Sequence, residues 1–410
     1  MAYIQSIVAF IMSKSILRSL VRKFSEVSSV ILLLIGFTIL KLILIGIVGS
    51  TADVGQMFIA GQALISGRDI LDPINTGGNP SYFLYGHSMI VTICIFISQY
   101  LNISFDAVIK VPAILSDLAI ALILFRIPVG GSRVALIYML NPVTFLLSVY
   151  HGQLHTVAVA GVVFSLYLMN RNRFVLSGFV LALASIIRQH FAVLIVLLVR
   201  RSGRFVNTGI MIFFVVLILS NLPLLSSSHI ENIFVPVSNY GLWGYSMLLS
   251  HGPRLLSLIG FENVGSLLAP LNNSLKLYGP GLYWLWALIF AFWYWYGKIE
   301  DEWSATLFFI LGIYSIGTGF GVQRLIWAVP FWLIVSFRQG IIFCVLASIY
   351  LIGSYWQWTL NDKYSLQSIT TNLDVLSAGD LIGLLLVGTF GFLTWAYCAR
   401  MFFQLWRTQG

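Results

Sequence analysis

Charge is scarce in this sequence. Only 14 acidic residues occur among 410, and 9% of all residues are charged, whereas roughly a quarter are charged in a soluble domain. Hydrophobic residues make up 59% of the chain, and its mean hydropathy is +0.93. This composition excludes an ordinary soluble protein and predicts one that crosses a membrane several times.

Cysteine is also rare, and no nucleotide-binding loop is present. The 3 cysteines, Cys94, Cys344 and Cys398, lie inside apolar runs without metal-ligand spacing, which is typical of inert buried thiols. No glycine-rich phosphate-binding loop of the Walker type occurs. The net charge of +9 is spread over short breaks between apolar runs. Control of membrane topology explains that spread better than a nucleic-acid partner.

The apolar runs predict an all-α, polytopic transmembrane helical bundle. Many of them approach the ~20 residues that a helix needs to cross a bilayer. They lack the alternation of barrel strands. About 11–13 spans are expected, near 27–49, 107–126, 134–149, 153–170, 174–188, 190–200, 205–224, 281–297, 304–320, 325–337, 340–356 and 380–399.

The domain organisation follows from these runs and from the basic breaks. We expect a cytoplasmic amphipathic segment over 1–26, then a transmembrane module over 27–224 that includes an outer loop at 50–106. A second outer loop covers 225–280, and a C-terminal transmembrane module covers 281–410. Most Lys and Arg fall on the predicted inner side, the usual positive-inside bias. This parity requires the apolar run 81–101 to lie in the interface or re-enter; a full span is the alternative.

Asp53 is the most informative single residue. It follows the first apolar run within Ser50-Thr51-Ala52-Asp53-Val54-Gly55-Gln56. A carboxylate at the edge of a bilayer is costly, which makes it a candidate functional residue. The alternative is an ordinary helix N-cap.

Other polar residues gather on the same predicted outer face. The His151 and His155 imidazoles could form a plain polar turn or hold a metal, although no third ligand follows at helical spacing. Arg188 interrupts an apolar stretch and either reaches the surface or pairs with an anion. Trp327, close to Arg324, could mark the membrane interface. The two charged residues within spans, Lys41 and Asp117, are expected to pair structurally.

The order of these features resembles the GT-C superfamily of polyprenyl-phosphate-sugar-dependent glycosyltransferases, especially its mannosyltransferase-like members. The resemblance covers roughly residues 27–337. Each motif is weak alone, and specificity lies in their order. The matching residues are Asp53-Val54-Gly55-Gln56, Ala60-Gly61-Gln62, Ser66-Gly67-Arg68, Lys110-Val111-Pro112, Ser116-Asp117, Asn141-Pro142, His151-Gly152-Gln153, Arg188-Gln189, Gln323-Arg324-Leu325-Ile326-Trp327 and Pro330.

The resemblance implies a fold of GT-C type and a catalytic role for Asp53 as the base that deprotonates an acceptor hydroxyl. It implies an inverting reaction on the extracytoplasmic side of a plasma, inner or endoplasmic reticulum membrane. The expected donor is a polyprenyl-phosphate-linked hexose, most simply mannose, and the acceptor is a glycolipid or a cell-surface glycan. Donor phosphate binding is expected from Arg188, Arg324 and Gln323, and substrate binding from His151, Gln153, His155, Gln56, His87 and Arg68.

This chain departs from the family pattern at His155, where many relatives have an acidic residue. A second carboxylate and a bound metal are thereby put in doubt, although Asp69 or Asp72 could substitute. A metal-independent mechanism with no cofactor is expected. Two other functions are open: a lipid-linked-oligosaccharide flippase with Lys41 and Asp117 in a midplane cavity, and a membrane glycan polymerase that would not depend on Asp53.

Overall fold

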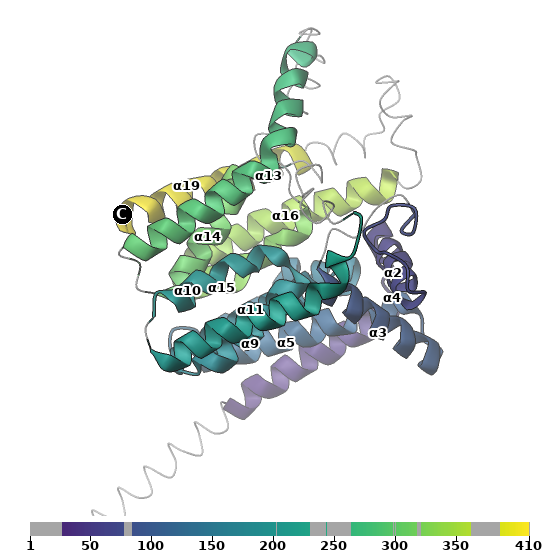
Figure 1. The fold of residues 1–410 in the computed structure, drawn as a ribbon, viewed down its shortest axis with the longest axis horizontal. Helices are drawn as coiled ribbons and strands as arrows, with labels where there is room; N and C mark the ends of the chain where they lie inside the picture. Colours follow the sequence, from purple (N-terminus) through teal and green to yellow (C-terminus); the bar gives the residue numbers. More distant parts are fainter. Residues whose placement is uncertain are drawn as a thin grey trace, which may run out of the picture.

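The chain folds into a bundle of helices (Figure 1). The computed structural model describes residues 27–77, 84–201, 203–229, 243, 264–297, 299, 301–317, 321–361 and 386–409, and every regular element among them is helical. The predicted all-α class is therefore confirmed. The predicted segment 1–26 lies outside the described residues.

Five described helices are long and apolar enough to cross a membrane, and a bent pair would make a sixth. This is the pattern of a multi-pass membrane protein. The bent pair joins Gly131–Leu140 to Pro142–His151 at an angle of 49°. The five single spans are Val27–Leu44, Phe105–Arg126, Arg204–Leu225, Phe337–Trp356 and Leu386–Thr408.

Shorter helices fill the space between these spans. Where the sequence predicted about 11–13 spans, only five helices of the described residues, or six with the bent pair, are long and apolar enough to cross, and several other predicted spans are shorter apolar helices. In chain order the elements after the first helix are α2 (Ala52–Ile65), α3 (Tyr85–Leu101), α4 (Phe105–Val108), α5 (Val111–Arg126), α6 (Gly131–Leu140), α7 (Pro142–Phe145), η1 (Leu146–His151), α8 (His155–Asn170), α9 (Phe174–Ile187), η2 (Gln189–Ile195), α10 (Val196–Val199), α11 (Arg204–Leu225), α13 (Val264–Tyr296), α14 (Glu302–Ile316), η5 (Val322–Trp327), α15 (Val329–Val335), α16 (Phe337–Asn361), η7 (Leu386–Phe390) and α19 (Gly391–Gln409).

The two predicted outer loops are partly helical. The segment 50–106 contains α2, α3 and α4, and the last part of 225–280 belongs to α13, which rises out of the bundle in Figure 1. The sequence analysis was wrong to treat these parts as loops. Residues 52–65 are too short and too rich in glycine to be read as a span, yet Asp53 lies in the first turn of α2, where the helix dipole favours an acidic side chain. Between 230 and 263 only Trp243 is described.

Small residues let neighbouring helices approach closely in one half of the bundle. Helix α9 packs between α8 and α11. A Cβ added at Gly178 of α9 would lie 2.1 Å from the Gly209 carbonyl oxygen of α11, and one at Gly161 of α8 would lie 2.8 Å from Ala184 Cβ. Close backbone approach of this kind is typical of helix packing in membranes.

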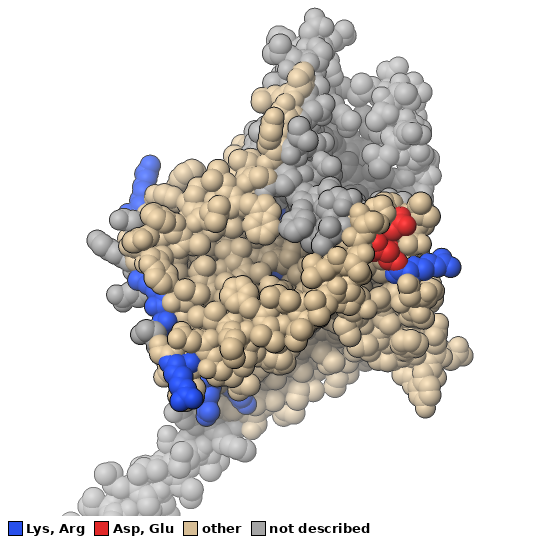
Figure 2. All heavy atoms as spheres, viewed as in Figure 1, with Lys and Arg blue, Asp and Glu red and all other residues tan. Residues whose placement is uncertain are grey.

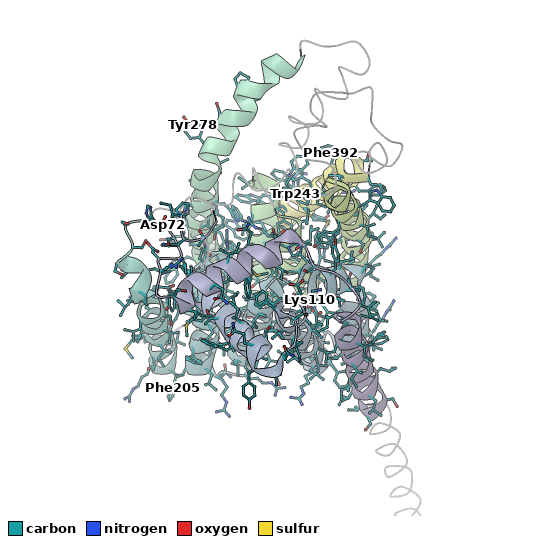
Figure 3. The ribbon with its side chains drawn as sticks, turned by 90° about the vertical axis from the view of Figure 1, so that its right-hand side faces the viewer. Asp72, Lys110, Phe205, Trp243, Tyr278 and Phe392 are labelled. Carbon is teal, nitrogen blue, oxygen red and sulfur yellow. The ribbon has the colours of Figure 1, made fainter. Side chains whose placement is uncertain are left out.

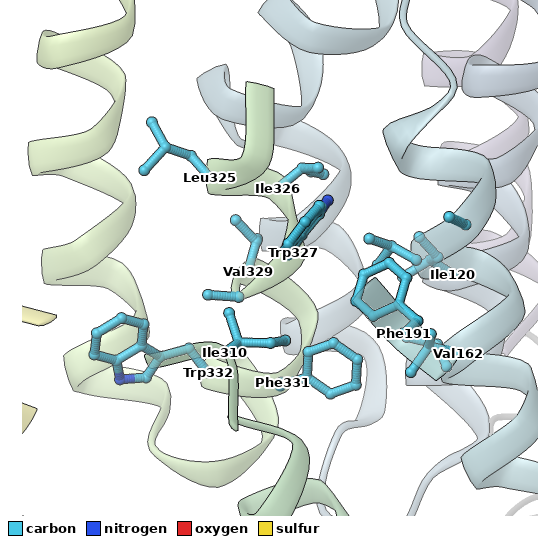
Figure 4. Packing of buried hydrophobic residues seen from close by; sticks show 14 of the residues in the cluster. Ile120, Val162, Phe191, Ile310, Leu325, Ile326, Trp327, Val329, Phe331 and Trp332 are labelled. Atoms are coloured by element: carbon cyan, nitrogen blue, oxygen red, sulfur yellow. The ribbon is translucent and has the colours of Figure 1, made fainter. Parts of the chain in front are cut away.

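The other half of the bundle is held by aromatic side chains. It contains α13, α14, α16 and α19, which lie above α5, α9 and α11 in Figure 1. The elements η5 and α15 join the two halves. Figure 4 shows Trp327 of η5 directed toward Phe191 of η2, with ring centroids 5.0 Å apart. This contact fixes η5 against the segment that follows α9.

Charged side chains are separated between the two ends of the molecule. On the face shown in Figure 2, several Lys and Arg side chains lie along one end, and a group of acidic side chains with a basic one beside it lies at the other. Helix α11 runs from one of these ends toward the other (Figure 1). Ser227, just past its C-terminus, donates a hydrogen bond to Asp69 Oδ2 at 2.5 Å. The segregation agrees with the predicted positive bias of one side.

Lys41 and Asp117 form a buried ion pair, as the sequence analysis expected. Lys41 Nζ lies 2.7 Å from Asp117 Oδ2. The carboxylate also accepts hydrogen bonds from Tyr138 Oη at 3.0 Å and Ser148 Oγ at 2.7 Å. The pair therefore ties the first helix to α5, α6 and η1.

We predict that Lys41→Met lowers the stability of the folded protein by about 3–5 kcal/mol, because it leaves a buried carboxylate without its cation. The double variant Lys41→Met/Asp117→Asn should recover part of the loss, since Asn is uncharged and its amide can accept from one hydroxyl and donate to the other. Thermal unfolding in detergent measures both. A single variant as stable as the wild type would contradict the structural role of the pair.

Candidate functional site

Asp53 contacts two of the residues that the sequence analysis selected. Its Oδ2 atom accepts a hydrogen bond from Gln153 Nε2 at 2.5 Å and lies 3.2 Å from His151 Nε2. The side chain of Asp53 is 22% exposed, whereas that of His151 is fully buried. The carboxylate is therefore fixed by polar neighbours on its inner side and still reaches the surface.

The chain reverses sharply between the two residues that contact Asp53. The π-helix η1 ends at His151, and Gly152 follows with a φ of +71°, a left-handed conformation that suits glycine. Gln153 comes directly after this turn. Thr51 Oγ1 lies 3.4 Å from His151 Nδ1, so both ring nitrogens of His151 face the segment that carries Asp53.

Arg188 lies in the break between α9 and η2 and is completely buried. It donates to His155 Nδ1 at 3.3 Å and to Gln153 Oε1 at 3.4 Å, and its Nη1 atom lies 3.2 Å from His87 Nδ1. A guanidinium only donates, so both Nδ1 atoms act as acceptors. Arg188 is therefore held in place, rather than reaching the surface as one alternative required.

Gln153 links the carboxylate to the guanidinium. Its amide nitrogen donates to Asp53 and its amide oxygen accepts from Arg188. This uses the two ends of one planar amide, so the two charged groups are placed at a fixed separation. The contacts unite three segments that are far apart in the sequence.

Arg324 extends this cluster on the far side of His155. Its guanidinium carbon lies 5.5 Å from the centre of the Trp327 ring, and Trp327 Nε1 donates to His155 Nδ1 at 2.9 Å. Trp327 is fully buried, so it does not mark the membrane interface. The Arg324 carbonyl accepts a hydrogen bond from the Tyr314 hydroxyl, which anchors η5.

Gln323 and His190 lie beside Arg324 and Trp327. Gln323 is 5% exposed, and its Oε1 atom has no hydrogen-bond partner among the described residues. The ring of His190 packs 5.2 Å from Trp327 and 5.0 Å from Tyr283, whose hydroxyl donates to the His190 carbonyl. The sequence analysis placed Trp327 in a motif but missed its contact with His155. It had no signal for Tyr283.

Two of the predicted substrate-binding residues are not part of this cluster. Gln56 on α2 and Arg68 beyond its end are exposed, and none of the contacts described for this structure joins either to Asp53. His87, in contrast, is brought to Arg188 from α3. The structure therefore gathers Asp53, His151, Gln153, His155, His87 and Arg188, with Arg324 and Gln323 beside them.

Asp69 and Asp72, two further acidic residues of the segment 50–106, cap turns. Asp69 Oδ1 accepts from the Leu71 amide at 2.9 Å, and Asp72 Oδ1 accepts from the Ile74 amide at 2.9 Å. Asn75 Nδ2 donates to Asp72 Oδ2 at 3.2 Å. Within the described part of the chain, no group of three or more His, Cys, Asp or Glu side chains is placed to hold a metal ion.

Comparison with known proteins finds no relative of this chain. No protein-family model, curated protein or solved structure matches the chain.

We predict that Gln153→Leu lowers stability by about 1–3 kcal/mol, because it leaves a buried donor of Arg188 without its acceptor. Gln56→Leu is the matched control. Its exposed side chain should change stability by no more than about 0.5 kcal/mol. Thermal unfolding of the two variants in the same detergent tests the bridge, and equal stabilities would contradict it.

Proposed function

We propose that this protein is an integral membrane glycosyltransferase of GT-C type. It moves a hexose, with mannose as the first choice, from a polyprenyl-phosphate donor to a hydroxyl of a glycolipid or cell-surface glycan. The observation that carries this proposal is the contact chain from Asp53 through Gln153 to Arg188. It joins a partly exposed carboxylate to a buried cation, which suits a reaction between a hydroxyl and a lipid phosphate ester.

In the proposed reaction Asp53 takes the proton of the acceptor hydroxyl. The acceptor oxygen forms a bond to the anomeric carbon as the bond from that carbon to the phosphate oxygen breaks. The configuration inverts, and the lipid phosphate leaves with the bonding electrons. Gln153 and His151 orient the carboxylate by contacting its Oδ2 atom. Holding a reacting group in the correct orientation lowers the activation barrier, because less entropy is lost on reaching the transition state.

Arg188 is proposed to stabilise the departing phosphate, with Arg324 beside it. Its acceptors His87, His155 and Gln153 are uncharged in the tautomers that the contacts require. They orient the guanidinium without cancelling its charge. An oriented cation in a low-dielectric site stabilises developing negative charge more strongly than one in water.

The contacts of Lys41 and Asp117 argue against the flippase alternative. Lys41 and Asp117 are buried, paired with each other and bonded to neighbouring hydroxyls. They hold four helical segments together, whereas charges along a translocation path should line an aqueous cavity. A glycan polymerase, in contrast, would not require Asp53. Whether activity depends on the Asp53 carboxylate therefore distinguishes the glycosyltransferase from the polymerase.

We predict that Asp53→Asn reduces transfer by at least about 10²–10⁴-fold, the usual contribution of a general base. Donor binding should persist, since Asn keeps the shape of the side chain. The assay follows radiolabel from polyprenyl-phosphate-mannose into membrane lipid extracts. Asp72→Asn is the control and should transfer at the wild-type rate. Full activity of Asp53→Asn would overturn the mechanism and favour a polymerase.

Arg188→Ala should weaken donor binding or transfer by about 10–100-fold, the loss expected for one charge-assisted hydrogen bond. Arg188→Lys should recover only part, because lysine lacks the planar fork. The rise in the protein's unfolding temperature on addition of a polyprenyl phosphate measures binding alone, and the transfer assay measures binding and chemistry together. The control Arg204→Ala removes an exposed arginine at the first residue of α11. Equal losses in both variants would contradict the role of Arg188.

A further inference from the structure

Lys110 lies at the entry of α5 and holds the segment that leads to Asp53. Its side chain is buried, and Figure 3 places it within the body of the molecule. Lys110 Nζ donates to the Val48 carbonyl at 3.2 Å and to the Gly49 carbonyl at 2.9 Å. These two residues directly precede the short run that enters α2, so the ammonium fixes where that run begins.

The stem of the same lysine supports the turn that carries the partners of Asp53. A Cβ added at Gly152 would lie 3.0 Å from Lys110 Cγ and 3.4 Å from Val54 Cγ2. Gly152 separates His151 from Gln153, and Val54 follows Asp53 in the chain. One side chain therefore contacts both segments whose functional groups meet at Oδ2 of Asp53.

A second contact ties the same segment to the same region. Ser50 Oγ donates to Asp106 Oδ2 at 2.6 Å, and Asp106 belongs to α4, just before Lys110. Gly49 lies between Val48 and Ser50, and a Cβ there would meet nothing within 4 Å. Because glycine is conformationally permissive, the position of the run 48–52 relies on these ties together with the contact of Thr51 with His151.

We propose that Lys110 is a positioning residue, which sets the separation between Asp53 and the 151–153 turn and so orients the carboxylate toward the acceptor. This inference rests on the proposed function for its catalytic consequence only. Its structural content, that Lys110 restrains the start of α2, is independent of which reaction the protein performs.

The first test compares Lys110→Met with the wild type, using the transfer assay. Methionine keeps most of the stem but removes the ammonium. We expect kcat to fall by about 10–100-fold, the effect of a small misplacement of a reacting group, while the KM for the donor is unchanged. In an Asp53→Asn background, Lys110→Met should cause no further loss. Loss of donor affinity, or an additive loss in that background, would overturn the positioning role.

The second test needs no activity. A nitroxide at Gly55→Cys would report motion at the start of α2, because Gly55 is exposed and a Cβ there meets nothing within 4 Å. The three native cysteines are buried, which favours selective labelling. The spectrum should show greater mobility in Lys110→Met and no change in the control Arg201→Gln.

The two tests separate the inference from the proposed function. Increased mobility without transfer by any form of the protein would retain the restraint and reject the glycosyltransferase proposal. Unchanged mobility in a folded Lys110→Met protein would reject the restraint itself. If Lys110→Met does not fold, Lys110→Gln takes its place, since its shorter polar side chain also lacks the ammonium that binds the Val48 and Gly49 carbonyls. It should raise mobility in the same way, and an unchanged spectrum would again reject the inference.

Discussion

The amide of Gln153 is the interaction on which the candidate site depends. Its side chain contacts both Asp53 and Arg188: the amide nitrogen donates to the carboxylate, and the amide oxygen accepts from the guanidinium. The separation of carboxylate and guanidinium therefore follows from the size of one planar group. Its position depends in turn on Gly152, whose left-handed backbone brings Gln153 and His151 to the same carboxylate.

A low-dielectric surrounding explains how the remaining charges are arranged. Buried ions are stable only when they are paired or well hydrogen-bonded. Lys41 and Asp117 satisfy that condition with each other and serve the fold. Arg188 is hydrogen-bonded to the uncharged rings of His155 and His87. Those two contacts orient its guanidinium without neutralising the charge. Lys41 and Asp117 thus form a structural pair, whereas Arg188 is the cation proposed to bind a phosphate.

The sequence predicted the helical class and the outline of most helices because long apolar runs with polar breaks have few other solutions in lipid. It also selected Asp53 and Arg188, because charges within or beside such runs are costly. It failed for α2, where glycines and a short length hide a helix, and for the beginning of α13. The contacts of Lys110 with residues about 60 positions earlier depend on tertiary packing and have no local signal.

The most direct measurement is the anomeric configuration of the product formed from a polyprenyl-phosphate hexose of known configuration. Purified protein would be incubated with a labelled donor and membrane lipid extract, beginning with mannose, and the new linkage determined by nuclear magnetic resonance. A single carboxylate base predicts a labelled product with inverted configuration. A product with retained configuration, or no transfer from any polyprenyl-phosphate hexose, would contradict the account.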